Sequence, residues 1–235
     1  MTSGHVVQSA VGDRPLSPAE RRQRNRQEML DAILLHARQI MREEGVAALR
    51  LRELARRLRF TVQALYKYYP SKSALYDALF REGIRIAAAR WNDVLITSES
   101  FWDKLEAGLV VFIQFAHEYP ELSELAFSRP VPGFVPSEES MEESHRLLQT
   151  FDVLIEEAIA SGELSADVSP TDVRNLYLSM LDGMVRQHIA NEPETPVGAG
   201  RYSGLVPAAI ALFRRAWDPQ WVLPESPSER DEQHM

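Results

Sequence analysis

Residues 51–75 read LRELARRLRFTVQALYKYYPSKSAL, and this stretch decides the fold of the chain. Thr61 can cap a short helix over Val62–Tyr69, which Pro70 ends because its ring cannot continue a helix. Ser71 can then cap the next helix. Another short helix precedes these, and its inward-facing apolar residues are Leu51, Leu54, Ala55 and Leu58. Two short helices joined by a tight turn and flanked by longer helices are typical of a helix-turn-helix unit.

Upstream of this unit, a long helix is predicted to begin at Ser17. Ser17 and Glu20 have the spacing of a capping box, and Pro18 suits the first helical position. Gly45 is expected to end the helix by taking the left-handed C-terminal conformation. The apolar stripe along the helix consists of Met29, Ile33, Ala37, Ile40 and Met41.

The stretch resembles the signature of the TetR family of transcriptional regulators, and the close resemblance covers roughly residues 26–80. The matching features are Leu54-Ala55, Ala64-Leu65-Tyr66, Tyr68-Tyr69 and Pro70-Ser71-Lys72, together with the upstream Ala37 and Gly45. Two positions depart from the family pattern. Arg59 stands in the turn where members usually have glycine, so a positive φ there would strain it. Arg50 stands where members often have threonine, which leaves the cap of its helix in doubt.

The resemblance and the helical periodicity predict an all-α fold, in which an N-terminal three-helix helix-turn-helix domain is joined by a helix to a larger helical ligand-binding and dimerisation domain. The joining helix is expected to run from Ser71 toward Trp91. The expected segments are a disordered arm (1–16), the DNA-binding domain (17–70), the ligand-binding and dimerisation domain (71–218) and a disordered tail (219–235). Further helices are predicted at 100–118, 121–129, 137–160, 170–191 and 204–217, with loops at Arg129–Pro136 and 193–203.

The charges of the chain are segregated, although its net charge of −8 at first argues against nucleic acid. Residues 1–85 hold sixteen Lys and Arg against nine Asp and Glu, a net charge of +7. Residues 86–235 hold ten against twenty-five, a net charge of −15. A basic N-terminal third on an acidic body is expected when one end of a protein meets phosphates.

The second short helix and its flanks are predicted to contact DNA. Gln63 can bond adenine edges, Val62 can pack on a thymine methyl, and Lys67 can reach guanine or phosphate. Tyrosine hydroxyls can donate to phosphates, and a helix N-terminus at Lys72 already favours an anion. The predicted DNA-binding residues are Arg50, Arg52, Thr61, Val62, Gln63, Tyr66, Lys67, Tyr68 and Lys72.

Several of these basic and aromatic residues also have a plain structural interpretation. Tyr66 is balanced between phosphate contact and packing, whereas Tyr69 suits the core better than a contact. Arg56 and Arg57 can simply be solvated. A second basic cluster, at the start of the first helix, is either a solvated helix end or a phosphate or minor-groove contact, and it consists of Arg21, Arg22, Arg24 and Arg26.

A single helix-turn-helix covers half a site, so a homodimer on a pseudo-palindromic operator is expected, with recognition helices about 34–36 Å apart. The resemblance places the dimer contact on the last two long helices; the alternative is that their apolar stripes are internal core. The predicted dimerisation residues are Leu176, Met180, Gly183, Met184, Gln187, Leu205, Ala209 and Leu212.

The central helices are expected to enclose a pocket for an unknown small-molecule effector of largely apolar character. The predicted ligand-binding residues are Trp102, Phe112, Phe115, His117, Phe127, Met141, His145 and Tyr177. For each of them, ordinary core or surface is the competing interpretation. An effector that prefers the DNA-incompetent state would move the joining helix and release the operator, which makes a repressor the expected function.

Other classes of protein fit less well. The chain has no cysteine, no stretch long enough to span a membrane and no secretory leader, so a cytoplasmic, nucleoid-associated bacterial protein is expected. No phosphate loop, nucleophile elbow or HExxH spacing indicates an enzyme, and no cofactor or metal is expected. Remaining alternatives are a metal bound by histidines on separate helices, a sensor-less architectural factor, or an activator. The Glu138, Glu139, Glu142 and Glu143 cluster is interpreted as an exposed acidic face.

Overall fold

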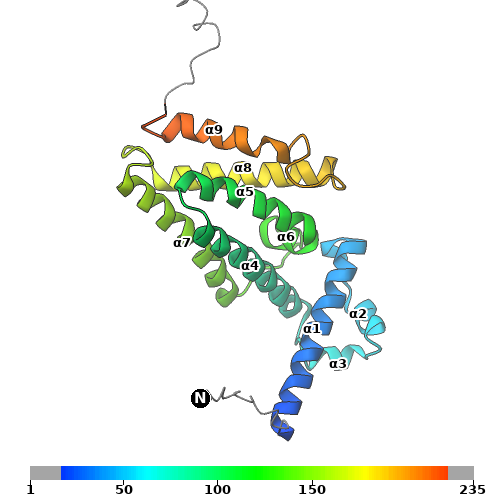
Figure 1. Ribbon diagram of the computed structural model, residues 1–235. Helices are drawn as coiled ribbons and strands as arrows, with labels where there is room; N and C mark the ends of the chain where they lie inside the picture. Colours follow the sequence, from blue (N-terminus) through cyan, green and yellow to red (C-terminus); the bar gives the residue numbers. More distant parts are fainter. Residues whose placement is uncertain (1–16, 222–235) are drawn as a thin grey trace, which may run out of the picture.

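A computed structural model describes residues 17–221, and every regular element in that part of the chain is helical (Figure 1). The predicted arm (1–16) and nearly all of the predicted tail (222–235) lie outside the described residues. The elements are α1 (Pro18–Glu44), η1 (Val46–Ala48), α2 (Leu51–Arg57), α3 (Val62–Tyr66), α4 (Lys72–Thr97), α5 (Phe101–Glu118), α6 (Pro120–Phe127), α7 (Glu138–Ser161), α8 (Pro170–Asn191), η2 (Ser203–Leu205) and α9 (Val206–Trp217).

The first helix begins as its sequence predicts. The Ser17 hydroxyl accepts from the Glu20 N–H at 3.2 Å, and the Glu20 carboxylate accepts from the Ser17 N–H at 2.6 Å, which completes the capping box. Gly45 ends α1 at φ 95° and ψ 153°. The positive φ explains the glycine, but this conformation is not the left-handed helical one that we expected, because the chain turns directly into η1.

In the helix-turn-helix unit, α2 packs against α1 and α3 packs against α2, around a small core that includes the buried Leu54, Ala55 and Leu65. Helix α3 ends at Tyr66, three residues earlier than the predicted Tyr69. The reason is a change of hydrogen bonding, since the Tyr68 N–H donates to the Leu65 carbonyl at 2.9 Å in a tight turn. Residues that precede a proline are also pushed away from helical geometry.

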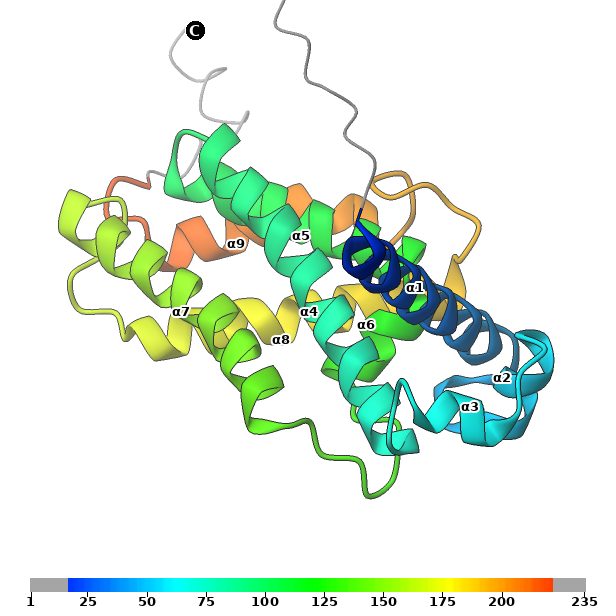
Figure 2. The same ribbon diagram turned by 90° about the horizontal axis from the view of Figure 1, so that it is seen from below.

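Helix α4 connects this unit to the rest of the chain without interruption, and it is longer than the expected end at Trp91. It runs into the middle of the larger domain, where α5, α6 and α7 pack around it (Figure 2). Trp91 lies at the centre: its ring stacks on Phe151 with centroids 4.1 Å apart, and its indole N–H donates to Thr150 Oγ1 at 2.8 Å. The two halves of the chain are therefore joined by a rigid element.

The remaining helices begin close to their predicted positions. Ser100, Ser137 and Ser169 each cap a helix through the side-chain oxygen, and Gly162 ends α7 in the left-handed conformation. The last helix begins at Val206, because residues 203–205 form a separate turn of 3-10 helix.

The acidic cluster at the start of α7 is only partly an exposed face, which corrects our interpretation. Glu139 pairs with Arg81 at 2.9 Å, and Glu143 pairs with Arg85 at 2.9 Å, so both carboxylates link α7 to α4. The neighbouring Glu138 and Glu142 are exposed as expected.

Candidate DNA-binding surface and ligand cavity

Gln63, Tyr66 and Lys67 form the outward face of α3 and its C-terminal cap. They are separated by three and four residues, which places them on one side of a helix, and all three are exposed. In the described chain, no carboxylate lies within ion-pair distance of Lys67. This face offers an amide, a phenol and a free ammonium group in one row, which are groups that recognise base edges and phosphates.

Other predicted contacts on and after α3 are partly occupied by the protein itself. The Thr61 hydroxyl accepts from the Ala64 N–H at 3.2 Å and caps α3. Val62 is half-buried against the core. Tyr68 is also half-buried, with its ring 6.4 Å from that of Phe60. These residues therefore support the exposed face more than they extend it.

The predicted basic contacts differ in availability. Arg50 is exposed but pairs with Glu44, and its side chain makes no hydrogen bond that caps α2, which confirms the doubt about this cap. The Lys72 ammonium is held 5.3 Å from the centroid of the Tyr76 ring. Arg52 is exposed, and no acidic partner lies near it within residues 17–221.

Arg59 occupies the turn between α2 and α3 with a φ of 55°. The turn therefore does require a positive φ, which costs a residue with a side chain about 1–2 kcal/mol. Arg59 is exposed beside the recognition face. Arg59 therefore holds a cation at a backbone position that glycine would occupy without strain.

Arg56 and Arg57 at the end of α2 are engaged by carboxylates. Arg56 donates to Glu53 at 2.7 Å, and Arg57 donates to Glu53 at 2.8 Å and to Glu43 at 2.6 Å. Hydrogen bonds from both guanidinium groups lower the pKa of Glu53 to about 2. The interpretation that both arginines are simply solvated is therefore corrected, because each is paired with a carboxylate and the Arg57 side chain is only 20% exposed.

An apolar cavity of about 210 Å³ lies between α5, α6, α7 and α8. Its polar groups are Ser123 and Asp182, and the Asp182 carboxylate pairs with Arg186 at 2.7 Å. Its apolar lining consists of Phe112, Phe127, Leu147, Leu148, Phe151, Leu178, Leu181 and Val185. A concave, mainly apolar site with a few polar groups is what a small ligand needs.

Only two of the eight predicted ligand residues, Phe112 and Phe127, line this cavity. Trp102, Phe115 and Tyr177 are packed core instead; the Tyr177 hydroxyl, for example, donates to the Leu105 carbonyl at 2.9 Å. Large aromatic residues do not identify the lining of the cavity, because most of them fill the interior of the protein.

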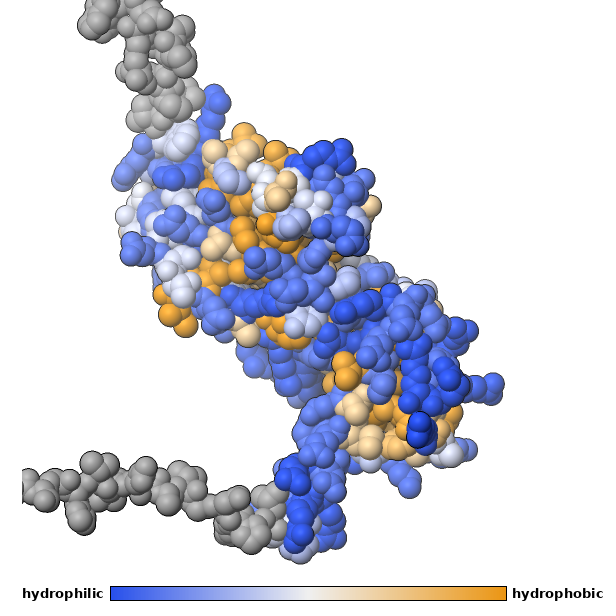
Figure 3. All heavy atoms as spheres, turned by 45° about the vertical axis from the view of Figure 1, so that its right-hand side comes forward, coloured by the Kyte–Doolittle hydropathy of each residue, from blue (hydrophilic) through white to orange (hydrophobic). Residues whose placement is uncertain are grey.

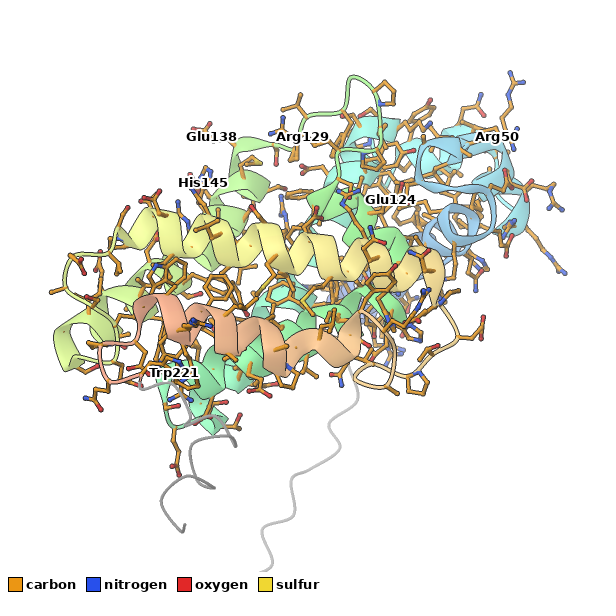
Figure 4. All side chains as sticks on the ribbon, turned by 90° about the horizontal axis from the view of Figure 1, so that it is seen from above. Arg50, Glu124, Arg129, Glu138, His145 and Trp221 are labelled. Carbon is orange, nitrogen blue, oxygen red and sulfur yellow. The ribbon has the colours of Figure 1, made fainter. Side chains whose placement is uncertain are left out.

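The other three predicted ligand residues also lie away from the cavity. Met141 is half-buried near the start of α7, and His117 is exposed at the end of α5. His145 is exposed on α7 (Figure 4).

The histidines in the described part of the chain do not assemble into a metal site. His188 is buried with no partner on either ring nitrogen, and its ring centroid lies 5.9 Å from that of His117. Burial, and then the neighbouring His117, lower the pKa of His188, because both disfavour the charged ring. Within residues 17–221, no group of three or more His, Asp or Glu side chains is placed to hold a metal ion.

A wider groove of about 950 Å³ lies between α1 and α4, but its character is different. Charged side chains, such as Asp31, Arg38 and Arg81, share its walls with apolar ones. It is open to solvent along the two helices, so we place a small ligand in the apolar cavity instead.

The outer faces of α8 and α9 carry exposed apolar residues. Leu176 is 54% exposed, Leu205 52% and Leu212 69%, and a Cβ on Gly183 would meet nothing within 4 Å. Met180 and Met184 are half-buried, and Gln187 is exposed. Ala209 is the exception: it is buried within the protomer and does not belong to this face.

Residues 33–79 match the model of bacterial regulatory proteins of the tetR family. The N-terminal domain is that of a TetR-family regulator. The match spans α2, α3 and the turn that holds Arg59. The family consists of regulators, in agreement with the prediction that the chain is not an enzyme.

Solved structures extend the likeness of the regulator to its larger domain. A protein of unknown function from Rhodococcus sp. RHA1 is 22% identical with a TM-score of 0.68, over 81% of this chain and 95% of the other. The TetR-family regulator PfmR from Thermus thermophilus is 18% identical with a TM-score of 0.61, over 78% and 97%. The regulator FadR from Bacillus subtilis, solved with stearoyl-CoA, is 16% identical with a TM-score of 0.62, over 77% and 96%. At these low sequence identities, the structural likeness shows a shared fold and nothing more.

Among curated proteins, none matches the sequence of the regulator significantly. None of the helices within residues 17–221 is both long and apolar enough to cross a bilayer.

In the regulator, α6 connects the cavity to the DNA-binding domain. Its Ser123 and Phe127 line the cavity, while Glu121 at its first turn is buried against α1. The Glu121 carboxylate accepts from Arg38 at 2.9 Å and from Arg42 at 2.9 Å. This short helix therefore contacts both the candidate ligand site and the helix that carries α2 and α3.

The same helix also lies very close to α4. A Cβ on Gly83 would come within 3.3 Å of the Leu122 carbonyl oxygen and 3.4 Å of its Cβ, which is tighter than ordinary contact. The Arg38 guanidinium also donates to Glu82 of α4 at 2.8 Å. The three helices α1, α4 and α6 thus form one tightly packed junction.

Proposed function

We propose that the regulator is a repressor, which binds a pseudo-palindromic operator as a homodimer and leaves it when a small, largely apolar effector fills the cavity. The observation that carries this proposal is the position of α6, between the cavity and the buried Glu121 contact with α1. The DNA-binding residues are the outward face of α3, with Arg52 and Arg59 beside it.

The dimer is supported by the uncovered surface of α8 and α9. Figure 4 shows these two helices side by side as the layer nearest to the viewer, with no other helix of the chain over them. Exposed leucines on both helices provide the apolar area that an interface needs. Two-fold pairing through this layer would hold two copies of α3 at a fixed separation, as successive major grooves require.

The effector is supported by the size and lining of the cavity. A volume of about 210 Å³ is that of about seven water molecules in the liquid. One carbon of an alkyl chain occupies about the same volume as one water molecule, so the cavity has room for about seven carbons. A charged group buried there would lack a partner, since Asp182 is already paired with Arg186. We therefore infer that the effector carries a compact hydrocarbon or aromatic group that fills the cavity, and that any polar end of the effector lies at Asp182.

Release would follow from displacement of α6. A ligand that presses on Phe127 and Ser123 shifts the helix that holds α1 through Glu121 and α4 through Leu122. Ligands can shift the equilibrium only by their difference in affinity for the two states, typically about 1–3 kcal/mol. Operator affinity should then fall about 5- to 150-fold.

The DNA-binding face is tested by comparing Gln63→Ala with Lys67→Ala. Gln63→Ala should relax base preference at one position by about 1–3 kcal/mol, because it removes a bidentate base contact. Lys67→Ala should weaken binding on all sequences and lower the salt slope by about 0.9 for each phosphate that the protein no longer neutralises. Binding to a randomised duplex library at several salt concentrations measures both effects. His145→Ala is the control, and equal behaviour of all three variants would contradict the docking of α3.

The cavity is tested with a series of 1-alkanols from four to twelve carbons. Each added methylene should raise affinity about fourfold, which corresponds to about 0.8 kcal/mol, until about seven carbons fill the cavity. Trp91 stacks on the lining residue Phe151, so its fluorescence reports binding. Val185→Trp fills the cavity and should abolish the effect, and operator release should follow the same order. Affinity that is unchanged by Val185→Trp would place the ligand elsewhere.

A further inference from the structure

The first turns of α1 project from the protein. Helix α1 begins at Pro18, whereas the family match begins at residue 33. Residues 18–28 are all exposed, and the helix extends beyond α3 as a free arm (Figure 1). It forms a narrow hydrophilic column in the space-filling view (Figure 3, bottom). Short helical segments gain most of their stability from packing, so an unpacked segment of this length needs another explanation.

The charges of this projection are sorted by face. With 100° between successive residues, Arg22 and Arg26 share one face, and Arg21 adjoins it within about 140°. Glu20 and Glu28 lie about 140° from the middle of the Arg22–Arg26 face, whereas Arg21 lies at its edge, about 20° from Glu28. The Glu28 carboxylate is paired with the Arg24 guanidinium at 3.4 Å. Arg24 is thus neutralised, while no carboxylate among residues 17–221 pairs with the other three arginines.

The basic face points toward the recognition helix. The Arg26 guanidinium lies 5.3 Å from the centroid of the Tyr68 ring, and Tyr68 follows α3 directly. Arg22 lies one turn farther out, about 6 Å along the axis. The basic face therefore begins beside Tyr68, at the end of the segment that carries Tyr66 and Lys67, and continues along α1 away from the body of the protein.

We propose that Arg21, Arg22 and Arg26 form a second DNA-contacting surface, which holds the phosphate backbone next to the bases read by α3. Charge complementarity and continuity with the α3 face support this occupant. Cations at a helix N-terminus are disfavoured by the helix dipole, but a phosphate bound there interacts favourably with both. The proposal rests on the proposed DNA binding and adds a longer operator footprint to it.

The test compares the triple variant Arg21→Gln, Arg22→Gln, Arg26→Gln with the single control Arg24→Gln. The DNA is a duplex that the wild-type protein selects from a random pool. Each phosphate that is no longer neutralised lowers the salt slope by about 0.9, so the slope of the triple variant should fall by about 2 to 5 across both protomers. Its base preference should stay that of the wild type, and Arg24→Gln should change neither quantity.

Two further measurements distinguish a DNA contact from an effect on folding. Their outcomes also distinguish failure of this inference from failure of the proposed function. Replacing the three arginines by lysine should restore most of the salt slope, because phosphates accept a point charge. Shortening the duplex flanks should bring the wild type down to the level of the triple glutamine variant. A triple variant with the salt slope of Arg24→Gln would overturn this inference alone. A pool from which the wild type selects no sequence would overturn the proposed function with it.

Discussion

Leu212→Arg is expected to convert the regulator from a dimer into a monomer. Leu212 is 69% exposed on α9, and its two copies would approach one another near a two-fold axis, so the substitution opposes like charges and removes apolar packing. Linked half-sites bind about 10²–10⁴ times more tightly than separate ones, and operator affinity should fall by this factor. Sedimentation and operator titration measure the two effects.

The matched control is Ile96→Arg, because Ile96 is 82% exposed at the end of α4 and lies on neither α8 nor α9. It adds the same charge without touching the proposed interface. Leu176→Arg, on α8, should behave as Leu212→Arg does. If Ile96→Arg alone dissociates the dimer, the interface lies elsewhere on the protein.

Glu121→Gln should destabilise the regulator by about 3 kcal/mol. Removal of one partner of a buried ion pair costs about 3–5 kcal/mol, and the lower limit applies because Arg38 keeps Glu82 and Arg42 is partly exposed. Urea unfolding at a fixed protein concentration measures the change, since the stability of a dimer depends on concentration.

Glu139→Gln is the control for this prediction. Its carboxylate also pairs with an arginine, Arg81, but the Glu139 side chain is 68% exposed, so the expected destabilisation is below about 1 kcal/mol. Glu121→Gln should additionally weaken the response of operator binding to the alkanols, because α6 no longer holds α1. A destabilised protein with an undiminished response would show that the coupling runs through α4 alone.

Local signals in the sequence predict most of the helices and the exposed face of α3. The Ser17 capping box, the caps at Ser71 and Ser100, and the loop at Arg129–Pro136 depend on neighbouring residues, so the pattern alone shows them. The end of α3 could not be predicted from these signals, because a tight turn before Pro70 replaces its last helical turn.

Long-range features could not be predicted in this way. Glu121 follows a proline at a helix start and has the pattern of an ordinary surface carboxylate, but its partners lie 79 and 83 residues away. The cavity is likewise bounded by four helices, and its position depends on which aromatic side chains leave space unfilled. Ala209 shows the same limit, since one stripe of α9 faces inward and the neighbouring stripe faces out.

The unbroken course of α4 has a mechanical consequence. Its 26 residues make a rod about 39 Å long, so a tilt of about 5° at the cavity end moves the other end by about 3 Å. Symmetry applies the same swing in the opposite sense to the second protomer, so the separation of the two recognition helices changes by up to about 7 Å against a spacing of about 34–36 Å. A small tilt of α4 at the cavity end is thus amplified by the length of the helix into a misfit between two successive major grooves.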